Sequence, residues 1–158
     1  MKIVLARIDD RLIHGQVATV WSKVTGCEKI IVVSDEVAKD ELRSTLLVQV
    51  APPGIKAHVL NVDKAIRVYN NPKNDFKALL LFTNPTDVLR LVEAGVGIES
   101  VNIGGMSFKE GKKQITGAIS VNDQDISSFK ELNKKGIELE IRVVASDSKV
   151  LLKDKLPL

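Results

Sequence analysis

The chain has 158 residues, of which 44% are hydrophobic, and its 23 basic and 20 acidic residues leave a formal net charge of +3. This composition predicts one globular domain with a substantial core, and the interspersed charges and 4% aromatic content disfavour a nucleic-acid-binding protein. The single cysteine, Cys27, excludes an intramolecular disulfide. Because no apolar run approaches the ~20 residues that span a bilayer and no signal peptide is recognisable, we expect a soluble, cytoplasmic protein.

The first predicted element is a strand that leads directly into a cluster of polar residues. The apolar run Ile3-Val4-Leu5-Ala6 is typical of a strand buried on both faces of a parallel sheet. Two carboxylates, a guanidinium and an imidazole follow in residues 9–14. After Gly15 the apolar residues recur at helical spacing, which predicts an amphipathic helix. Its buried face is expected to contain Val17, Val20, Trp21 and Val24.

Three strand–helix units are predicted next. Each consists of an apolar run, which predicts a buried strand, and an N-capping Ser or Asn that begins a helix. Proline or glycine ends each helix. The strands are expected at residues 29–33, 57–60 and 78–82, the N-caps at Ser34, Asn61 and Asn84, and the buried helical positions at Ala38, Leu42, Leu46, Val62, Ala65, Ile66, Tyr69, Val88, Leu91 and Val92.

The C-terminal part of the chain predicts two more strands and one helix. A strand at residues 100–103 is followed, after short extended structure, by a helix that begins at Asn122 and ends at Gly136. Residues 137–143 alternate apolar and charged side chains, which predicts a strand with one wet face near a sheet edge. Strands that alternate with helices predict a doubly wound, three-layer α/β/α fold around a mostly parallel sheet.

His14 is the main candidate for chemistry, because it follows the first strand, and ligands of open parallel sheets bind beyond the carboxyl ends of strands. A helix N-terminus disfavours an imidazolium, so we expect a neutral, nucleophilic ring. The backbone N–H groups of Gly15 and Gln16 would form an anion site, and Arg11 could hold phosphate oxygens bidentately. This combination suits a transient phosphohistidine. An ordinary surface histidine is the alternative.

The carboxylates beside His14 need a different role, because they repel phosphate. We expect one of them, Asp9 rather than Asp10, to orient Arg11 or the ring N–H of His14 and so fix the tautomer. Ordinary turn carboxylates are the alternative. The Gly104-Gly105 pair would lie at the same sheet edge, either as a close backbone approach to the site or as a simple turn.

Several other residues are expected to be structural. Leu12 and Ile13 either pack down or form a docking rim for a partner. Trp21 lies on the predicted core face, and Cys27 has no base near it in the sequence. His58 has no second histidine or carboxylate cluster nearby, so the sequence predicts no metal site.

Other phosphate-handling folds fit less well. The turn at residues 9–15 lacks the glycines of a dinucleotide-binding fingerprint, and no P-loop is present. A receiver domain would match the Asp9-Asp10 pair. It also requires an acceptor aspartate after the third strand, where the chain has Leu60-Asn61, and a lysine after the fifth, where it has Gly104-Gly105.

The segment Arg7–Val17, RIDDRLIHGQV, resembles the phosphorylation-site motif of the IIB components of the bacterial phosphotransferase system (PTS), mannose/fructose/sorbose family. The similarity runs the length of the chain, which predicts a single IIB domain over residues 1–158. Further blocks that resemble the family are APPG at 51–54, LFTNP at 81–85, NIGGM at 102–106 and SDSKV at 146–150.

The resemblance implies a function and a topology. His14 would accept a phosphoryl group on Nδ1 from a phosphorylated IIA protein and pass it to a sugar (mannose, fructose, sorbose or an amino sugar) during uptake through the membrane components IIC and IID. Arg11 would contact the phosphoryl group, supported by Asp9 and the backbone amides. The family fold has six or seven strands in the order 3-2-4-1-5-6 and needs no metal or organic cofactor. Such a subunit would be associated peripherally with the membrane transporter.

Overall fold

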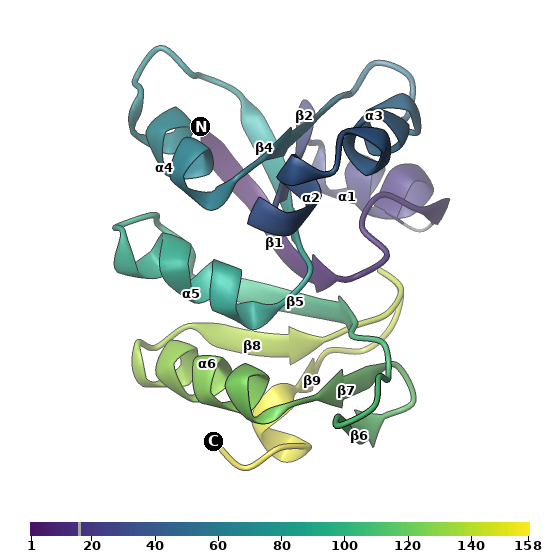
Figure 1. Cartoon of the computed structure of the whole chain (residues 1–158), viewed down its shortest axis with the longest axis vertical. Coiled ribbons are helices and arrows are strands. Elements are labelled where there is room, and N and C mark those ends of the chain that lie inside the picture. Colours follow the sequence, from purple (N-terminus) through teal and green to yellow (C-terminus); the bar gives the residue numbers. More distant parts are fainter. Residues whose placement is uncertain (16) are drawn as a thin grey trace.

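The computed structural model describes residues 1–15 and 17–158, and a seven-stranded sheet runs through its centre (Figure 1). The strands of this sheet are β1 (Lys2–Asp9), β2 (Lys29–Val33), β3 (Lys56–Leu60), β4 (Lys77–Phe82), β5 (Ser100–Gly105), β8 (Glu138–Ile141) and β9 (Val150–Leu151). Their order is β3-β2-β4-β1-β5-β8-β9, and only β8 and β9 pair antiparallel. The expected order is confirmed, with β8 as the sixth strand and β9 as an addition at the edge.

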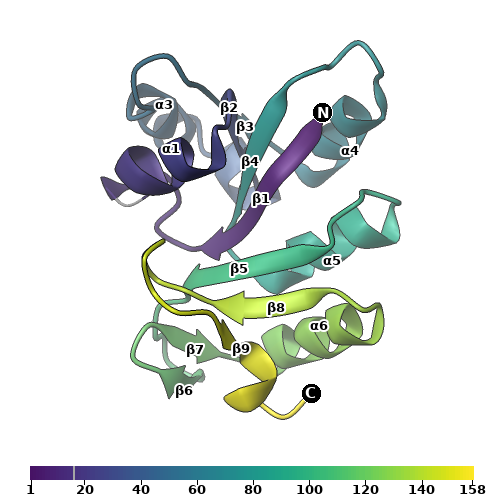
Figure 2. The same ribbon diagram turned by 180° about the vertical axis from the view of Figure 1, so that it is seen from behind.

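Helices cover both faces of the sheet, which confirms the three-layer prediction. One face carries α4 (Val62–Asn70), α5 (Pro85–Glu93) and α6 (Asp123–Lys134), which lie in front of the sheet in Figure 1. The other face carries the π-helical segment η1 (Val17–Trp21), α1 (Ser22–Thr25), α2 (Asp35–Lys39) and α3 (Glu41–Gln49). In Figure 2, which shows the molecule from the opposite side, α1 lies in front of the sheet. The remaining elements are the hairpin β6 (Lys113–Thr116) and β7 (Ile119–Val121) and the 3₁₀ turn η2 (Leu152–Asp154).

The N-caps that the sequence predicts are present. The side chains of Ser34, Asn61 and Asn84 each accept a hydrogen bond from the backbone N–H three residues later. Asn122 and Asp125 form a reciprocal capping box at the start of α6. These caps are local interactions, so a short sequence pattern is enough to place them.

The prediction of a single helix between Ser34 and Pro52 is wrong, because the structure has two helices, α2 and α3. Asp40 has an extended backbone and its side chain accepts a hydrogen bond from the N–H of Arg43, so it ends α2 and begins α3. The break rotates the buried face: Leu47 is 9% exposed, whereas the expected core residues Leu42 and Leu46 are 72% and 54% exposed.

The helix after Gly15 has the expected extent, because η1 and α1 together run from Val17 to Thr25, but its buried face differs from the prediction. Val17 and Trp21 are buried as predicted, whereas Val24 is 67% exposed. A π-helical turn contains more residues than an α-helical turn, so η1 shifts the regular helical spacing on which the expected face depends. Gly26, with φ of 65°, ends the helix after Thr25.

Two features of the C-terminal half differ from the alternatives that the sequence offers. Gly104 and Gly105 are the last residues of β5, so they do not form a turn. The strand β8 lies one strand from the sheet edge, as expected, but its charged face is only partly wet: the side chain of Glu138 is 41% exposed, whereas Glu140 is buried and accepts hydrogen bonds from Asn102 and Arg142. Within residues 1–15 and 17–158, no helix has the length and apolar character needed to cross a membrane.

Candidate functional site

The site lies at the carboxyl end of β1, in the middle of the sheet between β4 and β5. Asp9, the last residue of β1, is fully buried beside Gly105. The chain then turns toward η1 and carries Arg11 and His14 over this carboxylate. The side chain of Arg11 is 53% exposed and that of His14 is 20% exposed. A buried anion therefore lies beneath two groups that solvent reaches.

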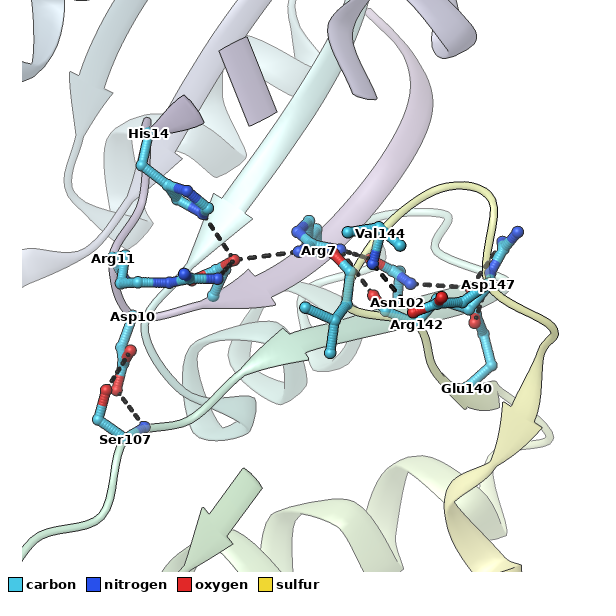
Figure 3. A network of polar contacts seen from close by, with 12 residues as sticks. Arg7, Asp10, Arg11, His14, Asn102, Ser107, Glu140, Arg142, Val144 and Asp147 are labelled. Atoms are coloured by element: carbon cyan, nitrogen blue, oxygen red, sulfur yellow. Dashed lines mark hydrogen bonds and ion pairs between the residues drawn. The ribbon is translucent and has the colours of Figure 1, made fainter. Parts of the chain in front are cut away.

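Asp9 is the centre of the site, and three cationic or imidazole side chains converge on it (Figure 3). His14 Nε2 lies 2.9 Å from Oδ2, and Arg7 Nη2 donates to the same oxygen at 3.1 Å. Arg11 makes a fork, with Nε to Oδ1 and Nη2 to Oδ2, both at 3.2 Å. The backbone N–H of Arg11 also donates to Oδ1.

These donors keep Asp9 ionised. Burial alone raises the pKa of Asp9, but hydrogen bonds from Arg11 and His14 and the positive charge of Arg7 outweigh burial and hold this pKa below its usual value. An ionised carboxylate only accepts hydrogen bonds, so the ring nitrogen that faces it, Nε2 of His14, must carry the proton. In the neutral ring the lone pair then lies on Nδ1.

The turn between Asp9 and His14 is held by packing and by a tether to β5. Leu12 adopts a φ of 61° and is fully buried, and Ile13 is 5% exposed. Both pack in the core beneath η1, so of the two expectations for this pair the docking rim is wrong. Asp10 accepts hydrogen bonds from the N–H and hydroxyl of Ser107 at 2.7 and 2.9 Å, which ties the turn to the end of β5.

Two hydrogen bonds connect the residues at the histidine to η1. The carbonyl oxygen of His14 accepts from the N–H of Ala18 at 2.8 Å, and that of Gly15 accepts from the Thr19 hydroxyl at 2.6 Å. Gly15 is exposed, so its backbone is open to a ligand. Gln16, the other residue expected to offer a backbone amide, lies outside the described residues.

Comparisons with known proteins identify the family of this chain. A family model described as "PTS system sorbose subfamily IIB component" matches residues 3–157. The chain belongs to this family. It is 55% identical to the sorbose-specific EIIB component of Klebsiella pneumoniae over 157 residues, covering 99% of this chain and 96% of that protein. The crystal structure of the IIBSor domain from the same organism has a TM-score of 0.95 at 56% identity and covers 98% of this chain and 96% of that chain.

A second group of relatives contains more than a IIB unit. The chain is 63% identical over 155 residues to the mannose-specific EIIAB component of Escherichia coli (strain K12), covering 98% of this chain but 48% of that protein. The chain thus spans about half the length of these curated relatives. Membership in the family makes this a IIB component of a sugar phosphotransferase system.

The site of this IIB component contains one group that the sequence analysis missed, Arg7. It follows the apolar run Ile3–Ala6 within β1 and contacts Asp9 directly. An arginine between apolar residues of a predicted strand is itself a signal, because a buried charge requires a buried partner. The adjacent Gly104 leaves the space for Arg7: a Cβ there would lie 1.9 Å from its Nη2. Of the two expectations for the glycine pair, close approach is the one the structure shows.

The other residues that were expected to be structural either lie at a distance from His14 and Asp9 or pack beneath them. Burial raises the pKa of the Cys27 thiol, and Trp21 is buried against Arg7, whose guanidinium lies 4.9 Å from the ring centre. His58 lies on β3, a strand that is not adjacent to β1. Among the described residues, no group of three His, Cys, Asp or Glu side chains could hold a metal ion.

Proposed function

We propose that this IIB component is a phosphocarrier. It accepts a phosphoryl group from a phosphorylated IIA protein on Nδ1 of His14 and transfers it to a sugar during uptake through the IIC and IID membrane components. The observation that carries the proposal is the 2.9 Å contact between His14 Nε2 and the buried carboxylate of Asp9, since this contact leaves the Nδ1 lone pair for phosphorus. Mannose, sorbose, fructose and N-acetylgalactosamine appear in the names of its relatives, so the sugar is a hexose or an amino sugar.

The proposed function consists of two transfers. In the first, Nδ1 attacks the phosphorus of the donor phosphohistidine, the new N–P bond forms, and the N–P bond of the donor breaks. The ring of His14 gains positive charge, which ionised Asp9 stabilises at Nε2. In the second, a sugar hydroxyl oxygen attacks the same phosphorus and releases its proton to solvent, and Nδ1 leaves with the bonding pair. A sugar phosphate and a neutral imidazole result.

Arg11 has the position required of a phosphoryl ligand. Its guanidinium is half exposed and its bonds to Asp9, at 3.2 Å, are long for charge-assisted hydrogen bonds. It therefore has freedom to turn one edge toward phosphoryl oxygens on His14, where a planar fork suits the geometry. Backbone amides at Gly15 and Gln16 would support the remaining oxygen. The reaction needs no metal or organic cofactor.

The chain offers a matched pair of variants to test this function, because it contains two histidines, His14 and His58. The protein is incubated with phosphoenolpyruvate, the general PTS proteins and a IIA protein, and intact mass and peptide mapping locate any acid-labile phosphoryl group. We expect label on the wild type and on His58→Gln, and none on His14→Ala with an unchanged circular dichroism spectrum. Phosphate on folded His14→Ala, or on an aspartate, would contradict the proposal.

A further inference from the structure

Arg7 is the largest side chain with no exposure to solvent, and it lies inside the central strand β1. Burial lowers the pKa of its guanidinium, and the attraction of Asp9 offsets part of this effect. Arginine nevertheless stays charged at neutral pH. A buried permanent charge is costly unless its partners are well placed, so its presence between the buried apolar residues Ala6 and Ile8 requires an explanation.

The surroundings of Arg7 are built to hold its guanidinium in one orientation. Nη2 donates to Asp9 Oδ2 at 3.1 Å and to the carbonyl oxygen of Val143 at 2.9 Å. Nη1 donates to Asn102 Oδ1 and to the carbonyl oxygen of Arg142 at 3.0 Å. The network continues from Asn102 to Glu140, so it joins the end of β1 to β5 and to the chain after β8 (Figure 3).

Two further contacts restrict the guanidinium. Trp21, in the helical segment that follows His14, places its ring centre 4.9 Å from Arg7 Cζ. On another side the guanidinium packs directly against Gly104, so closely that a Cβ at this position would lie 1.9 Å from Nη2. Arg7 therefore has little freedom to leave Asp9, in contrast to Arg11, which is half exposed.

This difference between the two arginines matters during the reaction. If Arg11 turns toward a phosphoryl group on His14, Asp9 loses one of its charge partners. Arg7 stays in place and keeps the carboxylate ionised and pointed at Nε2. With no solvent exposure, Arg7 does not itself reach a phosphoryl group or a partner protein.

We propose that Arg7 is a positioning residue for phosphoryl transfer, which fixes Asp9 so that His14 presents Nδ1 outward in both the free and the phosphorylated protein. The inference rests on the proposed function of His14. It assigns the two guanidiniums different tasks, because Arg11 binds the group that is transferred and Arg7 holds the carboxylate beneath it.

The kinetic test uses two substitutions of Arg7 and a surface control. Second-layer partners of this kind typically contribute about 10- to 100-fold to activity, so we expect kcat for phosphoryl acceptance to fall by about that factor in Arg7→Gln. KM for the phosphorylated IIA protein should change little, since Arg7 does not touch the partner. Arg7→Lys keeps the charge without the fork and should recover part of kcat. Arg90→Gln, which removes a half-exposed arginine on α5, should match the wild type.

A second readout needs no phosphoryl donor and thus separates this inference from the proposed function. Nitrogen-15 NMR of His14 detects the Nε2 proton, which the buried carboxylate protects from exchange with water. Faster exchange of this proton in Arg7→Gln, with partial recovery in Arg7→Lys, is expected. If Arg7 variants do not fold, Asn102→Ala removes one of the two acceptors of Arg7 Nη1 and should change the exchange in the same direction.

Three results would overturn the inference. One is a folded Arg7→Gln variant with wild-type kcat and wild-type exchange at Nε2. Another is an Arg7→Gln variant in which KM for the phosphorylated IIA protein rises while kcat is unchanged, which would indicate a contact with the partner. The third is an Asn102→Ala variant that leaves both readouts unchanged when Arg7 variants do not fold. If instead the wild type accepts no phosphate on His14, the proposed function fails, while the exchange measurement still tests whether Arg7 holds Asp9.

Discussion

At the scale of single residues, the site depends on the carboxylate of Asp9, which is buried beneath the side chains that bind it. Asp9 has no exposed surface, so its charge is balanced by Arg7 and Arg11 and directed at Nε2 of His14. The positive charges of Arg7 and Arg11 offset the repulsion between this carboxylate and an incoming phosphoryl group. An acidic residue is therefore compatible with the proposed phosphoryl site.

Gly104 provides a residue-scale prediction, since its hydrogen atom faces the guanidinium of Arg7. A Cβ at this position would lie 1.9 Å from Nη2 and 2.0 Å from Cζ. We expect Gly104→Ala to displace Arg7 and to reduce the free energy of unfolding by about 1–3 kcal/mol, the usual cost of overpacking. Urea unfolding measures this change, and phosphoryl acceptance should slow as it does in Arg7 variants.

The control for this prediction is Gly117, at which an added Cβ meets no atom within 4 Å and no positive φ is required. Gly117→Ala should change the free energy of unfolding by less than about 0.5 kcal/mol. Equal effects of the two substitutions would contradict the prediction, because they would show that contact with Arg7 does not require a glycine at position 104.

At the scale of elements, the break at Asp40 decides which side of α3 packs on the sheet. Leu47 belongs to the core beneath this face, whereas its neighbour Leu46 is 54% exposed. Leu47→Ala should therefore cost about 2–4 kcal/mol of unfolding free energy, as expected for a buried leucine. Leu46→Ala should cost less than about 0.5 kcal/mol. Thermal or urea unfolding compares the two, and similar losses would place the core face of α3 elsewhere.

The elements that the sequence predicts well are those with local causes. Apolar runs and N-caps place β2, β3, β4 and the helices that follow them, and Gly136, with φ of 78°, ends the last helix as expected. The break at Asp40 was missed because an Asp in the middle of a helical pattern is compatible with an exposed helical position as well as with a cap. The two-residue strand β9 has too few residues to form any pattern.

Prediction of the site shows the same division. Asp9, Arg11 and His14 are close in sequence, so the strand-to-helix turn brings them together without any knowledge of the sheet. Arg7, Asn102 and Glu140 meet only because β1, β5 and β8 are neighbours. Contacts of that kind follow from the strand order, which came from the family resemblance and not from the periodicity of the chain.

At the scale of the whole molecule, the two histidines belong to different parts of the sheet. His14 follows the central strand β1, whereas His58 lies on the edge strand β3 opposite Ile31 of β2. If His14 has a chemical role and His58 a structural one, protonation of His14 should affect phosphoryl transfer and protonation of His58 should affect stability. Acid should therefore affect the stability of the fold through a residue that has no part in phosphoryl transfer.

The pH dependence of unfolding tests this separation. Burial, together with the positive charges of Lys29, Lys56 and Lys64, lowers the pKa of His58 in the folded protein. Below the unfolded pKa of about 6.5, the unfolded chain binds a proton that the folded chain resists, so the free energy of unfolding falls as the pH falls. We expect urea unfolding between pH 7.5 and pH 5 to show a smaller fall in His58→Gln than in the wild type, with phosphoryl acceptance unchanged at pH 7.5. An equal fall in both proteins would mean that protonation of other groups destabilises the fold, because His58 is then as easily protonated in the folded chain as in the unfolded one.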